Sequence, residues 1–249
     1  MDILETDAYD RRQRRATSVF LFLSLLPFFL SSSAYFYLWI PESSPSVFAA
    51  AVKSIPVISL AAVVLCYQGG RSLWGVAGGL LFSAGGDICL IWHEMFIYGL
   101  TLFAVAHVLY SAAFLSHRYS PAPCSCTSVF LSIPLWLLGA GVYFYMYPNL
   151  QKQEDADVIT LAVAGYTLLI VTMATLAVRT HRPSTFLGSL IFMVSDLSLA
   201  LQVFKMIDQA PAGRAVVMTT YYLAQLLIAV GDVTADGDKG GGLGKRKRM

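Results

Sequence analysis

The chain has 249 residues, of which 57% are hydrophobic and 13% are charged, and its mean hydropathy is +0.64. Soluble globular domains carry about 25% charged residues, so this composition excludes a soluble catalytic domain. The formal net charge of +2 is less informative than the placement of the charges along the chain.

Apolar runs of membrane-spanning length follow one another from residue 17 to residue 231, separated by short polar breaks. A helix needs about 20 apolar residues to cross the hydrocarbon core of a bilayer. The runs therefore predict an all-α membrane protein, a bundle of about eight transmembrane helices at residues 17–39, 47–67, 72–92, 96–115, 128–147, 157–178, 185–204 and 214–231.

The basic residues of the loops and termini gather on one side of this predicted topology. If the N-terminus is cytoplasmic, the arginines before residue 17, the alternate short loops and the basic tail all face the cytoplasm. This asymmetry is the positive-inside pattern of membrane proteins. We therefore predict a basic cytoplasmic segment at 1–16, an eight-span domain at 17–231 that holds any catalytic site, and a flexible basic cytoplasmic tail at 232–249.

Two aspartates, Asp87 and Asp196, lie inside the apolar runs 73–92 and 186–204. A charged side chain at the centre of a membrane helix costs at least about 2.5–3.5 kcal/mol. Both carboxyl groups are therefore expected to face each other, a polar partner or a polar cavity. They are the first candidates for a functional site.

The sequence around the two aspartates is similar. Each ends a short segment, Leu81–Asp87 or Leu190–Asp196, and each is followed three residues later by a leucine. The two segments fall on the third and seventh predicted spans, which run in the same direction. One interpretation is a duplication into two parallel four-helix halves related by an axis along the membrane normal. The other is a coincidental match of short segments.

Further polar side chains interrupt the apolar spans at similar depth. With a rise of 1.5 Å per residue, they lie about 8–18 Å from the non-cytoplasmic end of their helices. A shared depth indicates one polar cavity, open towards the non-cytoplasmic leaflet. Its predicted lining comprises Asp87, Asp196, Lys53, His107, Tyr221, Tyr222 and Gln225.

Each of the supporting residues also has a purely structural interpretation. Lys53 could extend along its own helix to the membrane surface, or pair with an aspartate. His107 could bond a backbone carbonyl group. Tyr221 and Tyr222 could pack between helices, and Gln225 could hydrogen-bond a neighbouring helix.

The available side chains favour acid–base chemistry without a metal or another cofactor. The four histidines are dispersed over separate loops and spans, without the paired spacing of a hydrolytic zinc site. Serine-nucleophile, phosphate-loop and nucleic-acid motifs do not occur. In a cavity of low dielectric, one aspartate can stay protonated while its neighbour is ionised. Such a pair suits cleavage of ether or acetal-like bonds, because the acid delivers a proton and the carboxylate stabilises an oxocarbenium-like cation or activates water.

Several segments, in the same order, resemble the lysoplasmalogenase family of YhhN-like integral membrane proteins, and most of all its vertebrate branch. They are YFYLWIPE at 35–42, VKSIP at 52–56, FSAGGDICLIW at 82–92, FAVAH at 103–107, SDL at 195–197 and MTTYYLAQ at 218–225. The resemblance extends from about residue 33 to residue 230 and so covers nearly all of the membrane region.

The resemblance implies a multi-pass enzyme of the endoplasmic reticulum membrane. Its substrate would be a lysophospholipid, the lysoplasmalogen, whose vinyl ether bond is hydrolysed to a fatty aldehyde and glycerophosphoethanolamine or glycerophosphocholine. The two intramembrane aspartates of the family correspond to Asp87 and Asp196, one as the proton donor and the other as the group that stabilises the cation or positions water. Lys53 or His107 would then hold the phosphate or tune an aspartate, with Tyr221 and Tyr222 positioning either group.

The partners implied are membrane lipids and the lipid substrate, without nucleic acid, and self-association into a homo-oligomer stays open. Lys245 to Met249 resemble a dilysine retrieval signal, in agreement with cytoplasmic N- and C-termini. A proton-coupled transporter of a small molecule or lipid would also use intramembrane aspartates and a parallel repeat. A non-catalytic lipid-binding protein would tolerate the loss of both carboxyl groups.

Overall fold

The computed structural model describes residues 18–41, 44–67, 74–119, 126–153, 155–206 and 211–246. Within these residues the chain is helical and contains no β-strand. The predicted basic segment 1–16 and the final residues 247–249 lie outside this range. The last helix continues to Arg246, which is beyond the start of the predicted tail at residue 232.

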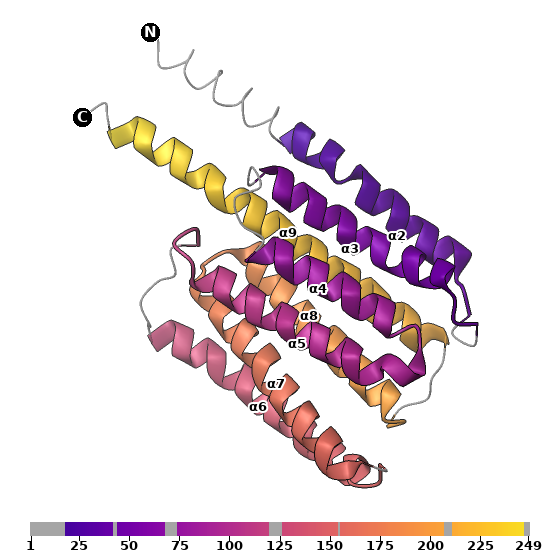
Figure 1. The fold of residues 1–249 in the computed structure, drawn as a ribbon. Coiled ribbons are helices and arrows are strands. Elements are labelled where there is room, and N and C mark those ends of the chain that lie inside the picture. The colour runs from indigo at the N-terminus through magenta and orange to yellow at the C-terminus, as the bar shows by residue number, and fades with distance from the viewer. Residues whose placement is uncertain are drawn as a thin grey trace.

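Among the described residues, eight α-helices, α2 to α9, form the bundle, in agreement with the helical bundle that the sequence predicts (Figure 1). In the described part of the chain, seven of them are long and apolar enough to cross a membrane. The first is Ser18–Leu38, which contains α2 (Leu26–Leu38). The others are α3 (Val47–Tyr67), α5 (Phe96–Leu115) after the short 3-10 helix η1 (His93–Met95), α6 (Cys126–Leu150), α7 (Ala156–Arg179), α8 (Pro183–Val203) and α9 (Pro211–Arg246).

The remaining helix, α4 (Val76–Cys89), is shorter than the predicted span at 72–92. Its 14 residues extend about 21 Å at 1.5 Å per residue, whereas the hydrocarbon core of a bilayer is about 30 Å thick. After Cys89 the chain turns and enters η1. Asp87 therefore lies close to the C-terminal end of a short helix, and α4 does not fill the space beyond that end.

Glycines allow α4 to approach its neighbour α5 closely. A side chain at Gly79 would meet the ring of Tyr110, and one at Gly86 would meet the ring of Phe103. The aromatic rings of α5 thus occupy the space that the missing side chains leave. This contact sets the distance between α4, which carries Asp87, and α5.

Helices that follow each other in the chain pack side by side, from α2 to α5 and again from α6 to α9. Contacts between these two groups join α9 to α3 and α4, and α5 to α7. Of the candidate spans, α9 is the most enclosed and α6 the most exposed. Figure 1 accordingly shows α2 and α6 on opposite edges of the bundle, with α4, α5, α8 and α9 between them.

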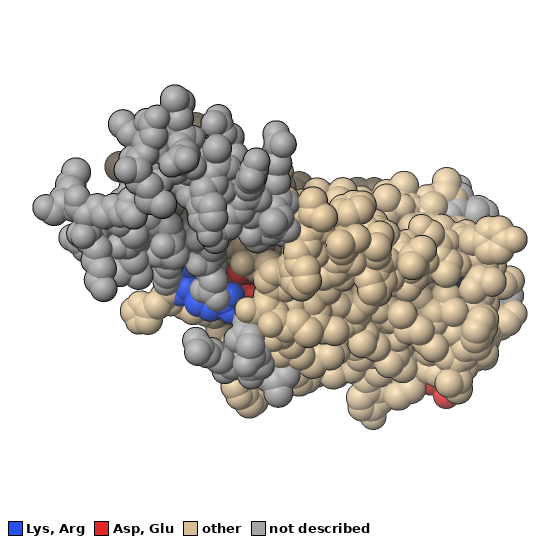
Figure 2. Space-filling view, turned by 90° about the horizontal axis from the view of Figure 1, so that it is seen from above, with Lys and Arg blue, Asp and Glu red and all other residues tan. Residues whose placement is uncertain are grey.

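An ion pair and a hydrogen bond tie the loop after α5 to α9 at one end of the bundle. Arg118 Nη2 lies 3.5 Å from Oδ2 of Asp232, and the Tyr119 hydroxyl donates to Oδ1 at 3.1 Å. Burial raises the pKa of the Tyr119 hydroxyl well above its ordinary value, so this group remains a hydrogen-bond donor. Figure 2 shows basic and acidic side chains at one end of the face in view and a further acidic side chain towards the other end, with a long surface of uncharged residues between them. The direction in which the chain crosses the membrane stays a prediction.

Candidate functional site

A polar cavity of about 300 Å³ lies beyond the C-terminal end of α4. Its lining residues come from α2 to α5, α8 and α9 and from the segments that follow α2, α4 and α8. Four of the seven predicted site residues line it, namely Asp87, Asp196, Lys53 and Tyr221. The structure therefore places both membrane aspartates in one cavity.

Asp87 is held by side chains from two other helices. Lys53 Nζ of α3 lies 3.7 Å from Oδ1, and the Tyr221 hydroxyl of α9 donates to Oδ2 at 2.6 Å. Edge-to-face contacts with Phe103 and Phe192 orient the Tyr221 ring. Lys53 thus pairs with the aspartate rather than extending to the membrane surface, and a cation compensates a carboxyl group whose side chain is only 2% exposed.

Asp196 has different partners, which are a phenol and an imidazole. The Tyr166 hydroxyl of α7 donates to Oδ2, and His107 Nε2 of α5 lies 3.1 Å from the same oxygen. His107 is fully buried behind Asp196, and its ring packs against those of Tyr166 and Phe192. It therefore contacts a carboxyl group instead of a backbone carbonyl.

The other two predicted residues lie behind the cavity. The Tyr222 hydroxyl donates to the backbone oxygen of Lys53 at 2.8 Å, and Gln225 Oε1 accepts from the Tyr110 hydroxyl at 2.7 Å. These bonds join α9 to α3 and to α5. Tyr222 and Gln225 are both almost completely buried, so they hold the helices that carry the site rather than facing the cavity.

Two residues at the site were not among those predicted. Tyr166 lies in the middle of its span, far from the membrane surfaces where tyrosines usually anchor a helix, and that position was the available signal. Arg214 lines the cavity near the start of α9. Its guanidinium group donates to Tyr35 Oη at 3.2 Å and to the Ile40 carbonyl at 2.7 Å, and lies 4.6 Å above the Trp39 ring.

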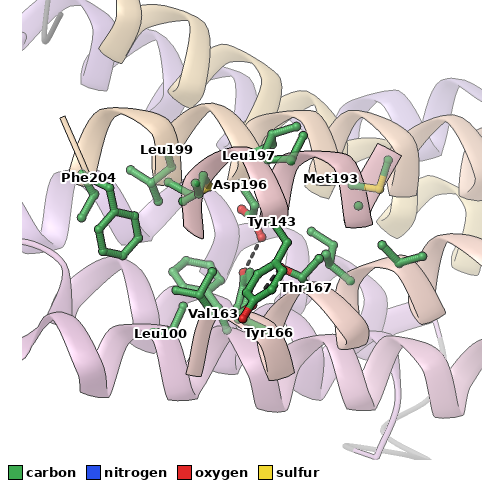
Figure 3. Close-up of a pocket in the computed structure, with 18 of the residues that line it drawn as sticks. Leu100, Tyr143, Val163, Tyr166, Thr167, Met193, Asp196, Leu197, Leu199 and Phe204 are labelled. Atoms are coloured by element: carbon green, nitrogen blue, oxygen red, sulfur yellow. Dashed lines mark hydrogen bonds between the residues drawn. The ribbon is translucent and has the colours of Figure 1, made fainter. Parts of the chain in front are cut away.

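A second, apolar cavity of about 90 Å³ lies on the other side of Asp196, between α5, α6, α7 and α8. Figure 3 shows Asp196 and Tyr166, joined by a dashed line, among the apolar side chains of Val163, Leu199 and Phe204. Asp196 lines both cavities. It is thus the carboxyl group at the boundary between a polar and an apolar compartment.

This arrangement can transfer protons. Two carboxyl groups face one cavity of about 300 Å³, Asp87 beside the ammonium group of Lys53 and Asp196 beside the Tyr166 hydroxyl and the His107 imidazole. Among the residues that the structure describes, no three His, Cys, Asp or Glu side chains come together in a group that could hold a metal ion. Two carboxyl groups on one cavity can act as a general acid and a carboxylate.

The chain matches the YhhN family over residues 48–231. It is 36% identical over 216 residues to lysoplasmalogenase TMEM86B of Rattus norvegicus, a match that covers 86% of each chain. It is 39% identical over 208 residues to lysoplasmalogenase TMEM86B of Homo sapiens, covering 83% of this chain and 84% of the relative. Lysoplasmalogenase TMEM86A of Bos taurus is 34% identical over 221 residues, with 84% and 88% covered. No solved structure matches the chain.

Proposed function

The chain belongs to the YhhN, or lysoplasmalogenase, family, and on this premise we propose that it hydrolyses the vinyl ether bond of lysoplasmalogens inside the membrane. The observation that carries the proposal is the position of Asp87 and Asp196 on one cavity. Vinyl ether hydrolysis needs a proton donor and an anionic group near a developing cation, and two carboxyl groups can supply both.

In this mechanism Asp196 is the proton donor. Tyr166 and His107 both contact its Oδ2, so Oδ1 is the oxygen that can direct a proton into the cavity. Nδ1 of His107 has no hydrogen-bond partner among the described residues. Because a buried N–H without an acceptor is costly, we place the ring proton on Nε2, where it is donated to Asp196.

Asp87 supplies the negative charge that faces the cation. When Asp196 protonates the β-carbon of the vinyl ether, the electrons of the double bond form the new C–H bond and leave an oxocarbenium ion. The bond from Tyr221 at 2.6 Å and the contact with Lys53 at 3.7 Å hold the Asp87 carboxyl group in place before the charge develops. Such preorganised groups stabilise a transition state without reorganising.

Water completes the reaction. It adds to the cationic carbon and returns a proton to Asp196, which restores the acid. The hemiacetal then breaks its bond to the glycerol oxygen, and the hydroxyl proton passes to that oxygen. The products are a fatty aldehyde and glycerophosphoethanolamine or glycerophosphocholine, with one water consumed.

The experiment is aldehyde release from an alkenyl-lysophospholipid by the purified protein in detergent. Asp87→Asn and Asp196→Asn are each expected to lower kcat by at least about 100-fold, since general acid–base groups contribute 10²–10⁴-fold. Asp157→Asn is the matched control, because Asp157 is an exposed residue in the first turn of α7. Full turnover in both site variants, as monodisperse proteins, would contradict the mechanism.

A further inference from the structure

The apolar cavity has no role in the proton transfers described above. The hydroxyl group of Thr167 in its wall is bonded to the backbone oxygen of Val163 at 2.8 Å, and that of Tyr166 is bonded to Asp196. A ligand in this cavity would therefore meet hydrocarbon on nearly every side. Apolar cavities of this kind remain dry and take up apolar molecules.

The apolar and polar cavities adjoin. Six residues line both of them, and five of these are apolar: Leu90, Phe96, Phe103, Leu199 and Val203, with Asp196 as the sixth. The described lining of the polar cavity includes three basic side chains, those of Lys53, Lys205 and Arg214. A molecule that occupied both cavities would thus place an anionic part on one side of Asp196 and a hydrocarbon part on the other.

We propose that the apolar cavity binds the alkenyl chain of the substrate, directly beyond the vinyl ether, while the phosphate headgroup occupies the polar cavity. The proposal rests on the function proposed above and specifies the orientation of the substrate. The β-carbon of the vinyl ether, which belongs to the chain, then lies beside Asp196. The ether oxygen, on the headgroup side, lies towards Asp87, which lines only the polar cavity.

The size of the cavity sets how much of the chain it encloses. An engineered cavity of about 150 Å³ holds one benzene molecule, so about 90 Å³ encloses only the first few methylene groups. The rest of the chain leaves over the surface of α6, where the lining residue Leu138 is 44% exposed. Specificity for the alkenyl chain is therefore determined by the residues around its first carbon atoms, not by residues near its far end.

Filling the apolar cavity tests this orientation. Ala200 lines the apolar cavity but not the polar one, and Ala200→Leu adds three carbon atoms to that wall. With a hexadecenyl lysophospholipid, we expect kcat/KM to fall by about ten-fold or more, because one or two methylene groups in an apolar pocket have effects of this size. With a propenyl analogue, which has almost no chain to place there, kcat/KM should stay within about two-fold.

Ala112→Leu is the matched control, because Ala112 is exposed on α5 and lines neither cavity. Equal losses for the long and the short substrate in monodisperse Ala200→Leu protein would overturn the proposal. Absence of turnover by the wild-type protein with either substrate would instead refute the function proposed above.

A binding measurement on the wild-type protein covers the case in which Ala200→Leu does not fold. A lysophospholipid with a photoreactive group on the first carbons of its chain should label residues of α5 to α8, and excess unlabelled lysophospholipid should prevent that labelling. Val142 and Val163, which line the apolar cavity, are the expected positions. Competitor-sensitive labelling confined to α2, α3 or α9, or no such labelling at all, would overturn the proposal.

Discussion

Replacing Lys53 by methionine tests the ion pair at the site. The change keeps most of the side chain's volume and removes the charge 3.7 Å from Asp87 Oδ1. At an effective dielectric constant of about 20, two unit charges at this distance attract each other by about 4.5 kcal/mol. Measured losses when one partner of a buried pair is removed are about 3–5 kcal/mol.

We expect a loss near the lower limit, about 3 kcal/mol, because the Lys53 side chain is 14% exposed whereas that of Asp87 is 2% exposed. For a chain of this length, about 2–4 °C of melting temperature correspond to each kcal/mol. Lys53→Met should therefore lower the melting midpoint of the purified protein in detergent by about 6–12 °C.

The double variant Lys53→Met with Asp87→Asn should melt at least about 3 °C above Lys53→Met alone, because the amide leaves no unpaired charge in the core. Lys205→Met removes the same charge from an exposed residue that lines the same cavity, and should shift the midpoint by no more than about 2 °C. If the double variant were no more stable than Lys53→Met, the reasoning from a buried ion pair would be refuted.

Three further predictions concern the site and its support. Tyr221→Phe keeps the ring contacts and removes the O–H group that is donated to Asp87. We therefore expect kcat to fall by about 10–100-fold. The control Tyr145→Phe, on the exposed face of α6, should have the kcat of the wild type. Gly188→Ala should lower the melting midpoint by about 2–6 °C, because the new Cβ would meet the α9 backbone at 3.0 Å. The control Gly165→Ala should not lower the melting midpoint, because the space around Gly165 is open. Since the four histidines lie on separate segments, turnover in the presence of a metal chelator should equal turnover without it, and a loss restored by added metal would contradict the acid–base mechanism.

Much of the fold could be predicted from the sequence, because every helix that crosses a bilayer needs about 20 apolar residues. The limits of the predicted runs agree with those of the helices within a few residues, except at α4 and at the end of α9, which continues to Arg246. There the apolar run continues past Cys89, and hydropathy alone could not show that the helix stops. The turn that follows α4 is a matter of backbone conformation and tertiary packing, which an apolar composition does not specify.

The site could be predicted in part. A charged residue within an apolar run is visible in the sequence. Asp87 and Asp196 can therefore be identified, because placing a charge inside a bilayer costs free energy. Tyr166 was not, because an aromatic residue in a span carries no such cost and its partner is 30 positions away. Depth along a helix places a residue at a level of the bilayer but does not say which way it faces. For that reason His107 was expected on the cavity, although it lies behind Asp196.

The contacts between the first four and the last four helices have a consequence for the two carboxyl groups. α5 packs on α7 and α9 packs on α3, two contacts that would correspond if a duplication, which stays a prediction, related the two halves by an exchange. Under this exchange α4 corresponds to α8. Asp87 takes one partner from its own half, Lys53, and one from the other half, Tyr221.

Asp196 follows the same rule, with Tyr166 from its own half and His107 from the other. Each of the two carboxyl groups thus takes one partner from the first four helices and one from the last four. The two environments differ in both partners, since Asp87 lies beside an ammonium group and a phenol, and Asp196 beside a phenol and an imidazole. In the mechanism proposed above, this difference lets Asp196 give a proton while Asp87 keeps its charge.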